Sequence, residues 1–188
     1  LHMWEEPCIS GEEGSGTVFF SGCPLRCVYC QNYHIANMET GKPVTRERLS
    51  EIFLELQKKG ANNINLVTPT HYTPEIVWAV KHAREHGLTL PIVYNCSGYE
   101  KVETFKMLDG IVDIYLTDFK YMDKEAAKRY SKAPDYPEVA KYALEEMVRQ
   151  TGEAAFSENE MMKKGVIVRH LLLPGYMKKN QRIDSIET

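Results

Sequence analysis

The chain has 188 residues, 43% of them hydrophobic, which is enough for one domain with a hydrophobic core. Its formal net charge of −3, from 23 basic and 26 acidic residues, argues against a nucleic-acid-binding surface. Five cysteines, an odd number, favour metal thiolates in a reducing compartment, and no apolar stretch reaches transmembrane length. We therefore expect a cytoplasmic protein. The first residue is Leu1 rather than Met, and the sequence stops near the helix that should follow the last predicted strand. We therefore expect residues 1–188 to be a single domain truncated at both ends relative to a longer chain.

Short β-branched and aromatic runs alternate with segments of helical spacing along the chain. We expect strands at residues 17–20, 63–68, 91–95, 111–119 and 165–173. We expect helices at residues 45–60, 73–87, 102–108, 124–130 and 137–152. Thr45 and Thr73 are the predicted N-caps of the first two helices. Residues 153–164 are predicted to be a polar connector with one more helical turn, and residues 178–188 to begin a further helix.

The order of these elements predicts an α/β fold. Strand and helix alternate five times through short loops, which is typical of right-handed βαβ units and a parallel sheet. The last strand is a nearly continuous apolar run, which suits a strand buried on both faces. We expect a curved, partial (β/α) barrel, with an open doubly wound sheet as the alternative. In both folds functional groups gather beyond the C-terminal ends of the strands.

The loop after the first strand carries three cysteines, Cys23, Cys27 and Cys30, in a C-x3-C-x2-C run. Three thiolates on one tight loop can bind three irons of a cubane and leave the fourth iron without a protein ligand. Something other than the protein would then coordinate the open iron. Tyr29, between two of the cysteines, offers an aromatic face on which a nucleobase could stack.

A second interpretation of this loop stays open. His34 follows Cys30 by four residues, so the three cysteines and His34 could form a Cys3His zinc site. Such a site would be closed and structural, and the chain would then be a zinc-stabilised interaction domain. Metal analysis distinguishes the two, because a cluster contains iron and sulfide.

Small polar and charged residues follow the other predicted strands at their C-terminal ends. They are Thr68 and Thr70 after the second strand, Asn95 and Ser97 at the end of the third, Asp118 and Lys120 at the end of the fourth, and Arg169 in the fifth. Asp118 and Lys120 are two residues apart on an extended segment, so both side chains can face the same side. We expect this set to bind a cofactor beside the cysteine loop.

The cysteine run resembles the signature of the radical S-adenosylmethionine (SAM) enzymes, with an aromatic residue before its last cysteine. Asp118-x-Lys120 and the Arg-x4-Pro-Gly pattern that begins at Arg169, in this order along the chain, resemble the activating enzymes of glycyl radical enzymes. Residues 65–71 and 169–175 are similar to those of an uncharacterised branch close to pyruvate formate-lyase-activating enzyme. The resemblance covers essentially the whole chain.

The resemblance implies a [4Fe–4S] cluster bound by the three cysteines, with SAM on the open iron. Tyr29, Gln31 and Asn32 would line the adenosine, Asp118 and Lys120 the methionine and ribose, and Arg169 would lie near the cofactor. The implied reaction is reductive cleavage of SAM to a 5′-deoxyadenosyl radical, which abstracts hydrogen from a glycine of a partner glycyl radical enzyme. A reduced flavodoxin or ferredoxin would supply the electron.

The chain departs from the family pattern in three places. Thr68-Pro69-Thr70 stands where relatives often carry Gly-Gly-Glu, and Asn95 stands where an aspartate contributes to a monovalent-cation site. The family barrel has six strands, of which we expect five βα units here. A radical reaction on a small molecule or a peptide side chain is an alternative, and so is a folded fragment that cannot complete the cofactor site.

Overall fold

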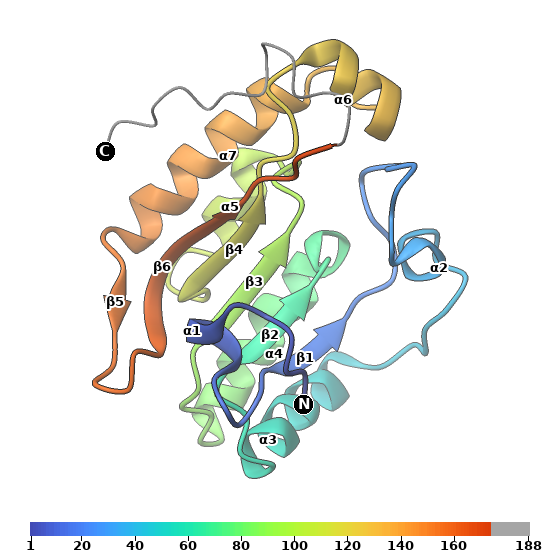
Figure 1. Cartoon of the computed structure of the whole chain (residues 1–188). Coiled ribbons are helices and arrows are strands. Elements are labelled where there is room, and N and C mark those ends of the chain that lie inside the picture. The colour runs from blue at the N-terminus through green and yellow to red at the C-terminus, as the bar shows by residue number, and fades with distance from the viewer. Residues whose placement is uncertain (174–188) are drawn as a thin grey trace.

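A computed structural model describes residues 1–173 of the chain (Figure 1). Its centre is a six-stranded sheet in the order β1-β2-β3-β4-β6-β5. The parallel strands are β1 (Gly16–Phe19), β2 (Ile64–Val67), β3 (Ile92–Cys96), β4 (Ile114–Asp118) and β6 (Met162–Arg169). The short strand β5 (Ala155–Phe156) is antiparallel to β6 at the edge. The sheet is curved and not closed, which confirms the predicted partial barrel.

Helices cover the two faces of the sheet unequally (Figure 1). The long helices are α3 (Arg46–Lys58), α4 (Thr73–Glu85) and α7 (Tyr136–Thr151), and the short ones are α1 (Pro7–Ser10), α2 (Tyr33–Ala36), η1 (Thr70–Tyr72), α5 (Val102–Met107) and α6 (Lys124–Ser131). Helices α3, α4, α5 and α7 pack on one face and bury the largest apolar cluster. On the opposite face Ile9 of α1 packs against Val93, Ile114 and Leu116. Burial on both faces explains why β2, β3 and β4 are mostly apolar. The prediction that the last strand is also buried on both faces was wrong, because β6 lies next to the sheet edge and most of its residues are partly or fully exposed.

The helix starts follow the predicted caps only in part. Thr45 is the N-cap of α3, and its hydroxyl accepts a hydrogen bond of 3.2 Å from the Arg48 amide. The prediction of Thr73 as an N-cap was wrong: Thr73 is the first residue of α4, and its hydroxyl donates to the Thr70 carbonyl at 3.0 Å. The physical reason is that η1 runs directly into α4, so the backbone is already helical before Thr73.

The predicted connector at residues 153–164 contains a hairpin rather than a helical turn. Strands β5 and β6 pair there, with Ala155 opposite Lys164, and the Ser157 amide closes the turn on the Met161 carbonyl at 2.8 Å. Strand β6 therefore begins three residues earlier than the predicted strand and ends at Arg169. The helix predicted at residues 178–188 lies outside the described residues. Among residues 1–173, no helix is both long and apolar enough to cross a membrane.

Candidate active site

A cavity of about 1050 Å³ opens at the C-terminal ends of the parallel strands. Its walls include every predicted site residue except Thr70. They are Cys23, Cys27, Tyr29, Cys30, Gln31, Asn32, Thr68, Asn95, Ser97, Asp118, Lys120 and Arg169. Gln31 and Asn32 are exposed, and Asn95 and Arg169 are half-buried. The side chains therefore line one cavity although they come from five separate parts of the sequence.

The cysteine loop is held against the end of helix α6. The Arg26 amide donates to the Ser131 carbonyl at 3.2 Å, and the Val28 amide donates to the Tyr130 carbonyl at 2.8 Å. Leu25 is 2% exposed and belongs to an apolar cluster that includes Tyr121. These contacts fix the loop on both sides of Cys27, so the position of this thiol is set by α6 as well as by β1.

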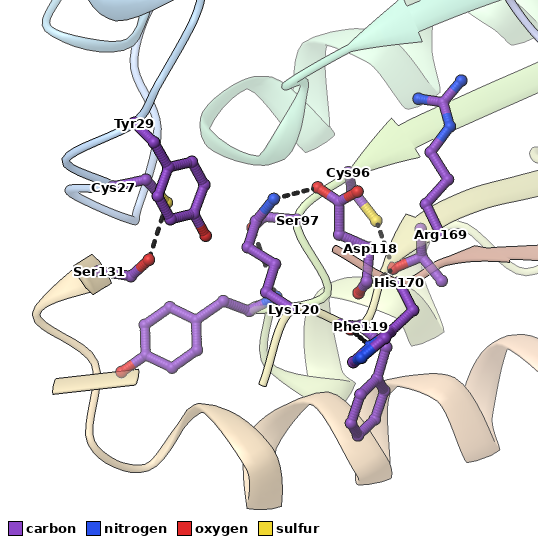
Figure 2. Close-up of polar contacts among 12 residues, drawn as sticks. Cys27, Tyr29, Cys96, Ser97, Asp118, Phe119, Lys120, Ser131, Arg169 and His170 are labelled. Atoms are coloured by element: carbon purple, nitrogen blue, oxygen red, sulfur yellow. Dashed lines mark hydrogen bonds and ion pairs between the residues drawn. The ribbon is translucent and has the colours of Figure 1, made fainter. Parts of the chain in front are cut away.

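Asp118 and Lys120, whose side chains were predicted to face the same side, form an ion pair inside the cavity (Figure 2). The side chain of Lys120 is 15% exposed and that of Asp118 is 30% exposed. Burial alone would lower the pKa of Lys120, but the charge and hydrogen bond of Asp118 outweigh it and the pKa is raised. Lys120 thus stays protonated, and the pair presents an ammonium group and a carboxyl group to the cavity.

The cysteine loop and the strand ends thus line one cavity. Comparison with known proteins identifies the family. A family model for the radical SAM superfamily matches residues 17–176. The chain belongs to the radical SAM superfamily. This membership implies a [4Fe–4S] cluster and SAM as cofactors.

Two curated relatives illustrate the place of this radical SAM chain. It is 30% identical over 186 residues to the uncharacterized protein MJ0674 of Methanocaldococcus jannaschii, which covers 94% of this chain and 49% of that protein. It is 31% identical over 134 residues to the pyruvate formate-lyase-activating enzyme of Clostridium pasteurianum, which covers 68% of this chain and 55% of that enzyme. The chain spans about half the length of the curated relatives it matches.

The donor set fits the radical SAM cluster. All three thiols are free and line the same cavity. Burial raises the pKa of Cys23 to about 11, and coordination to iron would remove its proton, as metals do for bound thiols. Within residues 1–173, no three His, Cys, Asp or Glu side chains are grouped to hold a single metal ion. A cubane makes a different demand, because each thiolate binds its own iron.

His34, the fourth ligand of the zinc interpretation, pairs with a carboxyl group in the same part of the chain. Its ring Nδ1 lies 2.7 Å from Glu39 Oε2, and its side chain is 74% exposed. His34 is not among the residues that line the cavity. The described geometry thus supports the cluster rather than a Cys3His zinc site.

Thr70 is not among the residues that line the cavity, and it contacts a buried carboxyl group instead. Its hydroxyl donates to Glu100 Oε1 at 2.8 Å, and Ser97 donates to the same oxygen at 3.2 Å. Glu100 is 2% exposed, and its Oε2 has no hydrogen-bond partner among residues 1–173. Burial raises the pKa of Glu100, so folding favours its protonated form. Glu100 is a link between β2 and β3 that the sequence reasoning missed.

Arg169 lines the cavity from β6, but acidic residues of the N-terminal segment already pair with its guanidinium. Nη2 lies 2.5 Å from Glu5 Oε2, and Nε lies 2.6 Å from Glu6 Oε1. The Glu5 side chain is only 7% exposed and also accepts from Asn65 Nδ2 at 3.0 Å. Both glutamates line the cavity. The sequence reasoning assigned them no role, and their only signal was an acidic pair in a loop.

Tyr136 and His170 are two further residues that the sequence reasoning did not select. Tyr136 of α7 is fully buried, and its Oη lies 2.8 Å from the Ser97 carbonyl and accepts from the Lys120 amide at 2.9 Å. It therefore fastens the ends of β3 and β4. His170 lines the cavity, and its Nδ1 lies 2.6 Å from the Phe119 carbonyl (Figure 2).

Proposed function

We propose that this chain cleaves SAM reductively at a [4Fe–4S] cluster and abstracts hydrogen from a glycine of a partner glycyl radical enzyme. One observation carries the proposal. The three cysteines and the polar strand ends, which the sequence places far apart, line a single cavity. The partial match to the activating enzyme of Clostridium pasteurianum supports the glycine substrate. A reduced flavodoxin or ferredoxin, and a cytoplasmic location, belong to the same proposal.

The residues of the cavity divide into roles by their chemistry. Cys23, Cys27 and Cys30 would hold the cluster, and when bound the cluster supplies the electron that splits the sulfonium into methionine and a 5′-deoxyadenosyl radical. Lys120 offers a cation for the SAM carboxylate, and Asp118 an acceptor for a hydroxyl or the ammonium. Tyr29 beside the cysteines provides the aromatic face for adenine. Gln31, Asn32, Thr68, Asn95 and Ser97 complete the proposed cofactor wall.

The deciding experiment is anaerobic reconstitution with iron and sulfide, followed by dithionite and SAM. We expect a brown protein with a [4Fe–4S] absorption band and formation of 5′-deoxyadenosine. Cys27→Ala should lose most of the iron and all of the product. Cys8→Ala is the matched control, because Cys8 is also a free, half-buried thiol but does not line the cavity. An intact cluster that yields no 5′-deoxyadenosine would contradict the proposal.

The glycine substrate has its own test. Incubation of the reduced, SAM-loaded protein with pyruvate formate-lyase should produce the electron paramagnetic resonance (EPR) doublet of a glycyl radical. Formation of 5′-deoxyadenosine without that doublet would leave the superfamily chemistry intact but reject pyruvate formate-lyase as partner. A small molecule or a peptide side chain would then be tested next as the hydrogen donor.

A further inference from the structure

The thiol of Cys27 receives a hydrogen bond from outside its own loop. Ser131 Oγ, in the last residue of α6, lies 2.9 Å from Cys27 Sγ (Figure 2). The two residues are 104 positions apart in the sequence. Ser131 is 1% exposed, so water does not compete for its hydroxyl. The backbone bonds from Arg26 and Val28 to the end of α6 hold the donor and the acceptor in register.

The contact is the end of a chain of hydroxyl groups. Tyr29 Oη is hydrogen-bonded to Tyr121 Oη, and Tyr121 Oη lies 2.7 Å from Ser131 Oγ. A thiolate can only accept, so once Cys27 binds iron the Ser131 proton must point at sulfur. Tyr121 must then donate to Ser131, and Tyr29 to Tyr121. The direction of all three hydrogen bonds is therefore set by the charge on Cys27.

We propose that Ser131 raises the reduction potential of the cluster by donating a hydrogen bond to the Cys27 thiolate, with Tyr121 strengthening that bond. The inference rests on cluster binding in the proposed function. The reduced cluster carries one more negative charge than the oxidised one, so a donor to a ligand sulfur stabilises the reduced form more. Tyr121 is fully buried, and hydrogen bonds in such a low-dielectric chain reinforce one another. Ser131 is a positioning and tuning residue, since it acts through Cys27.

The test is an anaerobic redox titration of the reconstituted protein, followed by the EPR signal of the reduced cluster. Ser131→Ala should shift the midpoint potential to a more negative value than in the wild type. A tenfold fall in the ratio of reduced to oxidised cluster at a fixed solution potential corresponds to 59 mV for a one-electron couple. Ser131→Thr, which keeps the hydroxyl, should titrate close to the wild type. Tyr121→Phe should shift in the same direction as Ser131→Ala but less.

Three outcomes distinguish the fate of this inference from that of the proposed function. If the wild-type protein forms no [4Fe–4S] cluster, the proposed function fails and this inference fails with it. If all variants bind a full complement of iron and titrate at the wild-type potential, the tuning role of Ser131 is wrong while the proposed function stands. Loss of iron in Ser131→Ala with an unchanged potential of the remaining cluster would mean that Ser131 is only structural, which also overturns the inference.

Discussion

Glu100 shows how one buried side chain links the strand ends behind the cavity to the stability of the protein. Its carboxyl group accepts hydrogen bonds from Thr70 and Ser97 on one oxygen, and the other oxygen has no partner in the described part of the chain. An ionised carboxylate in that position lacks the solvation that it has in the unfolded chain. The neutral acid is therefore the form that suits the fold.

We predict that Glu100→Gln stabilises the protein in a pH-dependent way. Burial raises the pKa of Glu100 above its ordinary value of 4.5, so above pH 4.5 the folded state binds more protons than the unfolded state. The wild-type free energy of unfolding should then decrease as the pH rises from about 4.5 through the folded-state pKa. The neutral variant lacks this loss. Its advantage should grow over the same window and disappear at lower pH.

Urea denaturation of both proteins across a pH series measures this difference. The apo protein is suitable for both, because no cluster is needed to observe the titration of Glu100. A difference in free energy that does not change with pH would show that Glu100 has the same pKa in the folded and unfolded states, contrary to this prediction.

Some residues of the candidate site could be predicted from the sequence and others could not. That the Asp118 and Lys120 side chains lie on the same side was predictable, because residues two positions apart on a strand share a face. Their place beside the other strand ends was predictable because the ends of neighbouring parallel strands meet at one edge of the sheet. Tyr136 and Ser131 were not predictable. The Tyr136 hydroxyl contacts Ser97, 39 positions away, and the Ser131 hydroxyl contacts Cys27, 104 positions away. No local pattern marks a helix residue for such a contact.

At the scale of elements, the ends of β3 and β4 approach each other at a glycine. Gly98 has φ +75°, and a Cβ built on it would lie 2.4 Å from the Asp118 carbonyl oxygen. Gly110 has nearly the same backbone angle, φ +72°, but a Cβ there would meet nothing within 4 Å. An alanine at Gly110 would therefore carry only the cost of the backbone conformation, whereas an alanine at Gly98 would also clash with its surroundings.

We predict that Gly98→Ala is clearly more destabilising than Gly110→Ala. The left-handed conformation should cost about 1–2 kcal/mol in both variants. The clash with the β4 backbone should add about 1–3 kcal/mol at Gly98 alone. Urea denaturation gives both free energies of unfolding. Equal losses in the two variants would mean that β3 and β4 are not held as closely as the structure shows.

Most of the strands and helices were predictable from the sequence, because apolar runs and segments of helical spacing alternate five times. The errors fall where short-range signals conflict with pairing. Residues 155–156 are exposed and lie in a polar segment, so only their partner β6 makes them a strand. Thr73 has the residue type of an N-cap, but the preceding η1 turn had no signal strong enough to predict it.

On the scale of the whole molecule, the N-terminal segment lies across the open side of the sheet and is fixed there by Arg169. Ile9 packs on the concave face, and Glu5 and Glu6 pair with the guanidinium at the far end of β6. This arrangement was not predictable. Residues 1–16 have the composition of a loop, and nothing in a sequence states which segment fills the concave side of a partial barrel.

We predict that Arg169→Met lowers the free energy of unfolding by about 1–3 kcal/mol. The expected loss is smaller than for a fully buried ion pair, because the Arg169 side chain is 35% exposed. The variant leaves the nearly buried Glu5 carboxylate without its cation. Arg48→Met is the matched control, because Arg48 also bridges two glutamates, Glu51 and Glu55, but on the exposed surface of α3.

Urea denaturation should show a larger loss for Arg169→Met than for Arg48→Met. Limited proteolysis should cut the first 15 residues of the Arg169 variant faster than those of the wild type. Equal losses and equal cleavage would indicate that apolar packing alone holds the segment in place.

The pairing of Glu5 and Glu6 with Arg169 has a consequence for biogenesis. The partners are 163 and 164 positions apart, so the glutamates leave the ribosome well before the arginine has been translated. Until then the two carboxylates lack their guanidinium partner and must stay solvated. The ion pairs of Glu5 and Glu6 with Arg169 can therefore form only after β6 has been translated.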